Sequence, residues 1–181
     1  MSDFHLDTDG VVREARQIAS PNCDRRPLGT AIELVVIHNI SLPPGEFGGD
    51  GVIELFTNRL DPEEHPYYRE IHQLKVSPHF FIRRDGELIQ FVPCRLRAWH
   101  AGTSQWKGRE RCNDFSIGIE LEGDDDTPFG AAQYVVLKDL LAALKQAYPI
   151  TSITGHSDIA PGRKTDPGPF FDWKRVTREH N

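Results

Sequence analysis

The stretch Ile32-Glu33-Leu34-Val35-Val36-Ile37-His38 decides the fold, because it joins a compact run of β-branched residues to a histidine. A short apolar run of this kind is typical of a strand that is buried in a sheet. His38 closes the run, and functional side chains often lie where a rigid strand passes into a loop. We therefore expect a buried strand that ends in a chemically active histidine.

A β-hairpin and an alternating strand are predicted further along the chain. Phe80 to Arg84 and Glu87 to Val92 flank Asp85-Gly86, and an Asp-Gly pair between two apolar runs is a strong hairpin signal. Phe115 to Glu122 alternates, so that the apolar side chains share one face and the other face carries Ser116, Gly118, Glu120 and Glu122. A glycine beside Glu120 on that face leaves room for another group to approach.

Helices are predicted around these strands. Apolar side chains recur at helical spacing on the longest helix, Ala131–Ala147, namely Tyr134, Leu137, Leu141, Leu144 and the following Tyr148. Three shorter helices and one further strand are expected at Gly51–Asn58, Pro66–Leu74, Asp172–Arg178 and Ser152–Gly155. Hairpins mixed with helices predict an α/β fold, with a central mixed β-sheet flanked by helices.

Two segments outside the predicted sheet have an irregular composition, within what we expect to be a single domain of residues 1–181. Residues 1–30 are polar and are expected to form an arm that wraps the domain, with a short strand near Gly10–Arg16. Residues 41–74 begin with a polar stretch rich in Pro and Gly, and glycines permit backbone changes that other residues resist. We expect 41–74 to be a mobile lid beside His38.

The composition excludes some classes of protein. A net charge of −6 argues against non-specific binding of nucleic acid, which needs a basic face. No apolar run approaches the ~20 residues of a membrane helix, and Met1 to Gly10 lack the apolar stretch of a secretory signal. We therefore expect a cytoplasmic protein without a membrane or nucleic-acid partner, in which Cys23, Cys94 and Cys112 are reduced thiols.

Three chemically capable side chains are predicted at strand ends, namely His38, Glu120 and His156. Two imidazoles and a carboxylate suit catalytic zinc, which keeps three protein ligands and leaves a fourth position to water. The chain has no His-Glu-x-x-His motif, so these ligands would come from distant segments. Ordinary structural interpretations are also open: a hydrogen-bonded strand end for His38 and a solvated charge on an edge strand for Glu120. Asp166, in the loop that follows His156, could be a turn residue before Pro167.

Four separated motifs resemble those of the N-acetylmuramoyl-L-alanine amidases of the amidase-2 type. In chain order they are His38–Gly45 (HNISLPPG), Trp99–Gly102 (WHAG), Asn113–Glu120 (NDFSIGIE) and Gly155–Gly168 (GHSDIAPGRKTDPG). The resemblance extends from about Ser20 to Trp173. It is strongest to the cytoplasmic members that act on 1,6-anhydro-muropeptides in peptidoglycan recycling, a process that also controls β-lactamase induction. It implies a zinc-dependent amidase whose fold peptidoglycan-recognition proteins share.

The resemblance also implies roles for individual residues, with a small muropeptide as substrate and no protein partner. It implies one zinc ion per chain, bound by His38, His156 and Asp166. It implies catalytic roles for Glu120, as the group that takes and returns a proton, and for Lys164, as a positive charge beside the developing oxyanion. Contacts to the muropeptide are implied for Asn39, Lys75, Trp99 and Arg111.

Alternative functions are weaker. Gly155–Asp158 resembles the nucleophile elbow of serine hydrolases, but Ile159 stands where a second glycine is required. A non-catalytic peptidoglycan-binding sensor would keep the groove and lose the reactive groups. A structural zinc site would be closed by four protein ligands, and the chain offers three. Trp99 remains open between stacking on a sugar and packing in the core, and His100 is expected to have a supporting structural role.

Overall fold

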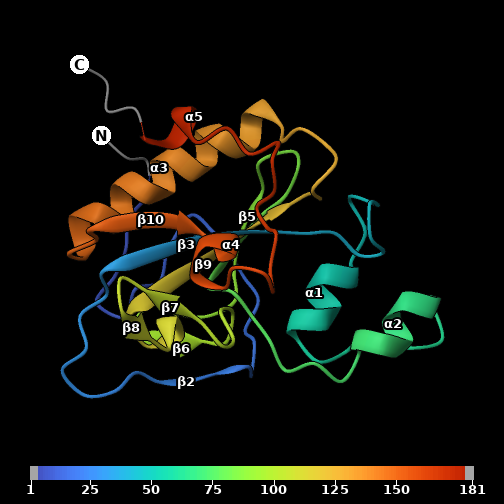
Figure 1. Cartoon of the computed structure of the whole chain (residues 1–181), viewed down its shortest axis with the longest axis horizontal. Helices are drawn as coiled ribbons and strands as arrows, with labels where there is room; N and C mark the ends of the chain where they lie inside the picture. Colours follow the sequence, from blue (N-terminus) through green and yellow to red (C-terminus); the bar gives the residue numbers. More distant parts are fainter. Residues whose placement is uncertain (1–3, 178–181) are drawn as a thin grey trace.

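The computed structural model describes residues 4–177, and a six-stranded mixed sheet lies at its centre (Figure 1). In spatial order the strands are β1 (Arg16–Gln17), β5 (Leu88–Gln90), β4 (Phe80–Ile82), β9 (Ser116–Glu122), β3 (Leu34–Ile40) and β10 (Ser152–Gly155). Within this sheet β4 and β5 pair antiparallel, and all other neighbours pair in parallel. The predicted α/β fold, a single domain with a mixed sheet flanked by helices, is confirmed.

Helix α3 (Ala131–Ala147) covers one face of the sheet and coincides with the helix that the sequence predicts (Figure 1). The main core lies between this helix and the sheet, where Val35, Ile37, Ile117 and Ile119 pack with Leu137, Leu140 and Leu144. The final helix, α5 (Lys174–Thr177), contacts α3. The predicted range for α5 extends to Arg178, which lies outside the described residues.

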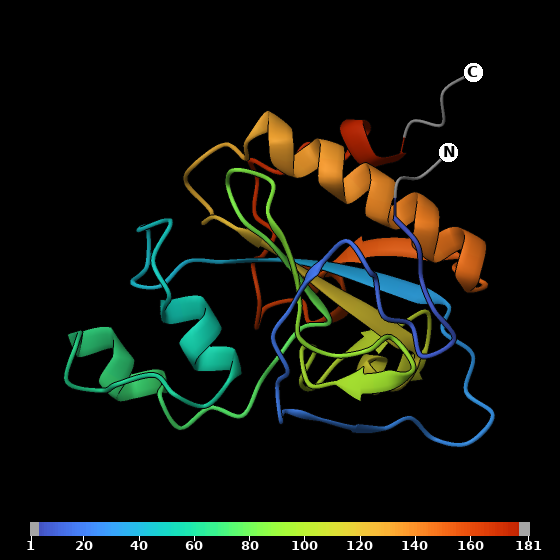
Figure 2. The ribbon, with the colours of Figure 1, turned by 180° about the vertical axis from the view of Figure 1, so that it is seen from behind.

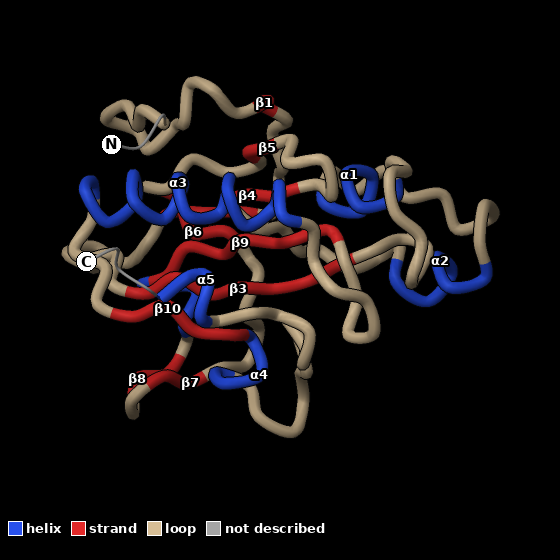
Figure 3. Tube along the Cα trace, turned by 90° about the horizontal axis from the view of Figure 1, so that it is seen from above, coloured by secondary structure: helices blue, strands red, loops and turns tan. Residues whose placement is uncertain are grey.

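Helices α1 (Gly51–Phe56) and α2 (Pro66–Ile71) lie together at one end of the molecule (Figure 3). Both fall within the ranges that the sequence predicts. They form a second apolar cluster with Phe81 and Ile89, which face away from α3. The sheet is therefore covered on both faces, which explains why its strands are so apolar.

Small elements complete the fold beside the main sheet. Two short antiparallel pairs are β2 (Cys23–Arg25) with β6 (Leu96–Ala98), and β7 (Gln105–Trp106) with β8 (Arg109–Glu110). A 3-10 helix, η1 (Cys112–Phe115), leads into β9, and a short helix, α4 (His156–Ile159), follows β10 directly. The N-terminal residues cross the side of the molecule that Figure 2 brings to the front.

The structure corrects the predicted strand at Gly10–Arg16, because the first strand begins only at Arg16. Gly10 has a φ of +78°, and the buried side chain of Gln90 binds this segment. Its Oε1 accepts from the backbone N–H of Val12 at 2.8 Å, and its Nε2 donates to the Gly10 carbonyl at 2.9 Å. A side chain here makes the hydrogen bonds that a strand partner would otherwise make.

The other local predictions are largely confirmed. β4 and β5 form the predicted hairpin around Asp85-Gly86, and Gly86 has the positive φ that such turns require. β3 continues two residues beyond His38. Cys23, Cys94 and Cys112 are free thiols.

Among the described residues, no helix combines the length and the apolar character needed to cross a membrane.

Truncation of Leu140 to Ala should test the main core. Leu140 is fully buried between α3 and the sheet, so the substitution should lower the free energy of unfolding by about 2–5 kcal/mol. Val135 lies on the same helix with 59% of its surface exposed, and Val135→Ala is the matched control. Urea unfolding would measure both. Equal losses for the two variants would contradict this packing.

Candidate metal centre

A cleft of about 560 Å³ opens where the central strands end. Its reactive side chains are His38, Glu120, His156, Lys164 and Asp166, and an apolar wall is formed by Leu55, Phe56, Tyr67, Ile71, Leu74 and Val76. Ligand sites in sheets of this kind commonly lie at the carboxyl ends of the strands. The cleft is therefore the candidate site.

Strand register brings three of the reactive groups together. His38 and Glu120 are direct partners across the parallel pair β3–β9, so their side chains stand beside each other on the same face. Ile37 is the partner of Gly155 across β3–β10, which brings His156 next to His38. β9 lies between β3 and β4, so the interpretation of Glu120 as a solvated charge on an edge strand is wrong.

Asp166 reaches the same place through a loop that is bound to α4. The backbone N–H of Ser157 donates to the Asp166 carbonyl at 2.9 Å. A Cβ on Gly155 would lie 2.8 Å from the Pro167 ring, so glycine allows this loop to close against the start of α4. The interpretation of Asp166 as a turn residue before proline describes its backbone but omits its side chain, which points at the two histidines.

Three ligand atoms face one another at nearly equal distances. His38 Nδ1 lies 3.0 Å from His156 Nδ1, and Asp166 Oδ2 lies 3.1 Å from each of these nitrogens. A tetrahedral ion with bonds of ~2.0–2.1 Å separates its ligand atoms by about 3.3 Å. The triangle therefore has nearly the size that a zinc ion requires.

Hydrogen bonds on the far side of each ring fit metal binding. His156 Nε2 donates to the Ala101 carbonyl at 3.0 Å, which leaves the Nδ1 lone pair directed at Asp166. His38 Nε2 lies 3.0 Å from His100 Nδ1, and His100 Nε2 lies 3.0 Å from Ser116 Oγ. When each Nε2–H donates along this chain, His38 also presents the Nδ1 lone pair. Such supporting bonds are typical of metal-binding histidines.

The charges also fit a cation. Burial lowers the pKa of His38 to about 4, so this imidazole is neutral at physiological pH. Burial alone would raise the pKa of Asp166, but the contacts of its side chain with His156 and His38 outweigh burial and hold the pKa below its usual range. The donor set is therefore a neutral His38 nitrogen, a second imidazole nitrogen from His156 and one carboxylate, which suits a divalent ion such as zinc.

Glu120 stands beside the ligand triangle without completing it. Its Oε1 lies 3.8 Å from His38 Nδ1, and its Oε2 is buried with no hydrogen-bond partner among the described residues. Burial raises the pKa of Glu120 well above its usual value, the Asp166 charge raises it further, and the Lys164 charge opposes both. A buried carboxylate with an unused oxygen is suited to exchanging a proton with a bound molecule.

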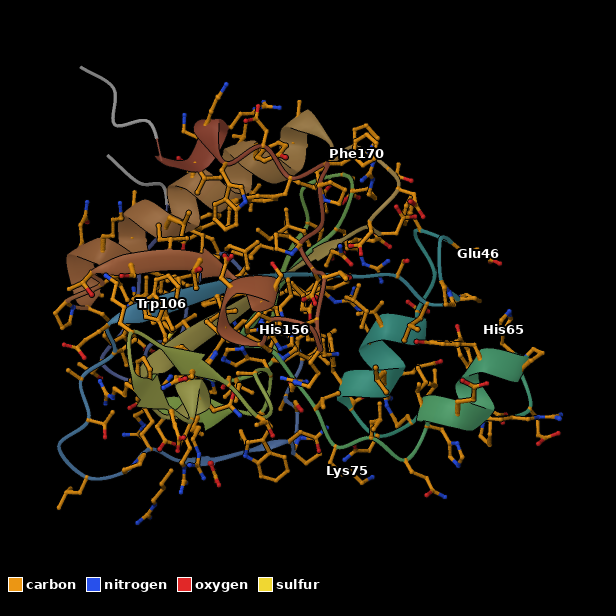
Figure 4. All side chains as sticks on the ribbon, in the orientation of Figure 1. Glu46, His65, Lys75, Trp106, His156 and Phe170 are labelled. Carbon is orange, nitrogen blue, oxygen red and sulfur yellow. The ribbon has the colours of Figure 1, made fainter. Side chains whose placement is uncertain are left out.

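Of the four residues predicted to contact the muropeptide, the structure places one in the cleft, one in a neighbouring hollow and two outside both. Asn39 lines the cleft, and its Nδ2 donates to Asp125 Oδ1 at 2.8 Å. Lys75 is exposed on the connection that follows α2, and Figure 4 shows it well apart from His156. Trp99 is half-buried and, like Lys75, is not among the residues that line the cleft. Arg111 is exposed, forms an ion pair with Asp114 at 3.3 Å, and lines a neighbouring hollow.

Two features of the cleft escaped sequence reasoning. Asp125 accepts from Asn39 and from Thr165, so it joins the end of β3 to the loop that carries Asp166. The run Asp124-Asp125-Asp126, one residue beyond the end of β9, was the available signal. The apolar wall comes from α1, α2 and the connection after α2, and only the tertiary arrangement brings these segments to the site.

The serine hydrolase alternative has no support in this geometry. Ser157 would need a neighbouring imidazole as its base. His156 instead uses Nε2 for the Ala101 carbonyl and directs Nδ1 to Asp166 and His38.

Comparison with known proteins gives consistent results. A family model described as N-acetylmuramoyl-L-alanine amidase matches residues 28–169. The chain is 58% identical over 163 residues to the 1,6-anhydro-N-acetylmuramyl-L-alanine amidase AmpD of Escherichia coli K12, covering 89% of each protein. A crystal structure of a selenomethionine derivative of AmpD superposes with a TM-score of 0.93 at 56% identity, covering 95% of this chain and 97% of that one.

A more distant structure carries a substrate. It is the complex of the amidase AmiD from E. coli with anhydro-N-acetylmuramic acid-L-Ala-D-γ-Glu-L-Lys, with a TM-score of 0.59 and 29% identity. The match covers 94% of this chain and 63% of that one.

Replacing Glu120 with Gln should stabilise the metal-free protein at neutral pH. Because burial raises the pKa of Glu120, the folded protein holds this proton more tightly than the unfolded chain does. Below about pH 4.5 both states are protonated and the gain should be absent; it should grow as the pH rises above that value. Urea unfolding in the presence of a chelator would measure it, with the exposed Glu110→Gln as control. A variant that is less stable than wild type at neutral pH would contradict the burial argument.

Proposed function

The chain belongs to the N-acetylmuramoyl-L-alanine amidase family, and on that premise we propose that it hydrolyses the amide between 1,6-anhydro-N-acetylmuramic acid and L-alanine in muropeptides. The observation that carries this proposal is the convergence of His38, His156 and Asp166 beside Glu120 in one cleft. The 58% identity to an amidase named for this substrate supports the choice of substrate.

We propose that the site holds one Zn²⁺ per chain, bound by His38 Nδ1, His156 Nδ1 and Asp166 Oδ2. Zinc with three protein ligands supplies a water molecule with a pKa near ~7 and a Lewis acid for the carbonyl. A closed structural site would need a fourth protein ligand. Glu120, another carboxylate in the cleft, has its Oε1 3.8 Å from His38 Nδ1 and is not part of the group of three ligand atoms.

Glu120 and Lys164 then have distinct roles. As a carboxylate, Glu120 accepts a proton from the attacking water, and as an acid it returns that proton to the leaving L-alanine amine. Its raised pKa brings it nearer to the pH at which both transfers are efficient. Lys164 lines the same cleft and holds a positive charge against the developing oxyanion. A peptidoglycan sensor that only binds would not need this pair.

The peptide part of the substrate is expected to contact positively charged side chains. The muropeptide carries free carboxylates, and Arg163 lines both the cleft and the neighbouring hollow that contains Arg111. We propose that the peptide extends along this positive path, with Asn39, Lys75 and Trp99 as further contacts. We propose that the protein's substrates are soluble fragments met in the cytoplasm during peptidoglycan recycling, as the name of the 58% identical relative suggests.

The activity is tested directly with anhydro-N-acetylmuramyl-tripeptide, with and without a chelator, and with mass spectrometry of the products. We expect anhydro-N-acetylmuramic acid and the free tripeptide, no cleavage after chelation, and recovery with Zn²⁺. Faster cleavage of intact, non-anhydro strands would contradict a role in recycling. Full activity in a metal-free preparation would contradict the metal mechanism.

Glu120→Gln and Lys164→Ala should separate catalysis from metal binding. Neither residue is a proposed ligand, so both variants should retain about one zinc per chain while turnover falls ~100-fold or more. Lys145→Ala, an exposed change on α3, is the control and should leave turnover unchanged. Loss of zinc from either cleft variant would mean that its role is misassigned.

We further propose that part of residues 41–74 moves over the cleft, with the largest motion in α2. The sequence suggested a weakly anchored segment, but α1 buries Val52, Ile53, Leu55 and Phe56. The loop before α1 is also bound to the sheet, through the Gly48 N–H to Glu122 at 2.6 Å and through Arg83 to the Gly49 carbonyl at 3.0 Å. In contrast, α2 buries only Tyr68, although Tyr67 and Ile71 line the cleft.

Hydrogen exchange on the zinc-loaded protein tests this motion. Reaction product should increase the protection of residues 59–75, because α2 has little buried apolar surface to hold it in place. Residues 51–56 should be protected with or without product. High protection of 59–75 that product leaves unchanged would contradict a lid.

A further inference from the structure

His100 and Ala101 support both histidine ligands at once. His38 Nε2 lies 3.0 Å from His100 Nδ1, and the Ala101 carbonyl accepts from His156 Nε2 at 3.0 Å. The two residues are adjacent in the loop between β6 and β7. The position of this one dipeptide therefore sets the orientation of both imidazoles, as partners behind a metal ligand commonly do.

The side chain of Asn113 fixes the position of the backbone at residues 100–101. Asn113 Oδ1 accepts from the backbone N–H of His100 at 3.1 Å and from that of Ala101 at 2.8 Å. Because two donors face one atom, that atom must be the oxygen of the amide. Asn113 lies in η1, whose backbone is itself held, since Arg26 donates to the carbonyls of Asn113 and Asp114 at 3.0 Å each.

The His100 ring has no freedom to compensate for a shift of its backbone. A Cβ on Gly118 would lie 2.4 Å from His100 Cγ, so the imidazole rests directly on β9. Its Nε2 is held by Ser116 Oγ at 3.0 Å. The space that Gly118 leaves beside Glu120 is thus filled by His100, and any movement of the 100–101 backbone is passed to the His38 ring.

From these contacts we propose that Asn113 is the positioning residue for both histidine ligands, acting through residues 100–101. Asn113 is not among the residues that line the cleft, and its side chain bonds to neither ligand. This role links two of the sequence motifs. Trp99–Gly102 contains the two residues that contact the histidine ligands, and Asn113–Glu120 contains the side chain that holds those two residues in place. The inference rests on the proposed metal site.

The test compares Zn²⁺ affinity among variants, by competition with a chromogenic chelator. Asn113→Leu removes the acceptor at similar volume and should weaken Zn²⁺ binding ~10-fold or more. Asn113→Asp keeps an oxygen in place and should restore the affinity. Gln90→Leu is the control, because the side chain of Gln90 also accepts from a loop N–H and Gln90 does not line the cleft. Gln90 is the more buried of the two amides, so its loss tests general destabilisation at least as severely. Asn113→Ala repeats the test if Asn113→Leu fails to fold.

A second readout separates positioning from general loss of stability. Co²⁺ bound in place of Zn²⁺ has a visible spectrum that reports ligand geometry, and we expect it to change in Asn113→Leu and to be unchanged in Gln90→Leu. Affinity and spectrum like those of wild type in Asn113→Leu would overturn the inference. The inference would also be overturned if Gln90→Leu lost as much Zn²⁺ affinity as Asn113→Leu when both variants had lost the same free energy of unfolding. A wild-type protein that binds no Zn²⁺ would instead refute the proposed function itself.

Discussion

Parallel pairing of β3 with β9 and with β10 is the constraint on which the site depends. The register makes His38 the direct partner of Glu120 and brings His156 beside them. Three reactive groups therefore lie together toward the carboxyl ends of neighbouring strands. Strands in such a sheet must be covered on both faces. Helix α3 covers one face, and α1 covers part of the other, leaving the cleft at the strand ends.

The site concentrates buried polar groups that work against folding. Burial lowers the pKa of His38, His79 and His100 and raises that of Glu120, so each group resists its charged form. The structure offsets much of this with hydrogen bonds; His79, for example, accepts from the Gly118 N–H and donates to the Leu96 carbonyl. A divalent cation would stabilise the cluster of His38, His156 and Asp166. The proposed chemistry needs the same three residues as ligands.

The sequence predicted what short-range patterns control. Alternation in Phe115–Glu122 gave the correct face for Glu120, and helical spacing gave α3 with its observed bounds. It could not reveal that β9 is central, because alternation does not distinguish an edge strand from one covered on both faces. Gln90 replaced an expected strand partner with side-chain hydrogen bonds. Asp166 and the supporting role of Asn113 depend on loops whose geometry no periodicity encodes; only a family resemblance pointed to Asp166.

The most direct test of the account is a crystal structure of the zinc-loaded protein with anomalous data collected at the zinc edge. We predict one peak per chain, ~2.0–2.2 Å from His38 Nδ1, His156 Nδ1 and Asp166 Oδ2, with an open position on the side of Glu120. A peak bound elsewhere, or a fourth protein ligand closing the site, would contradict it.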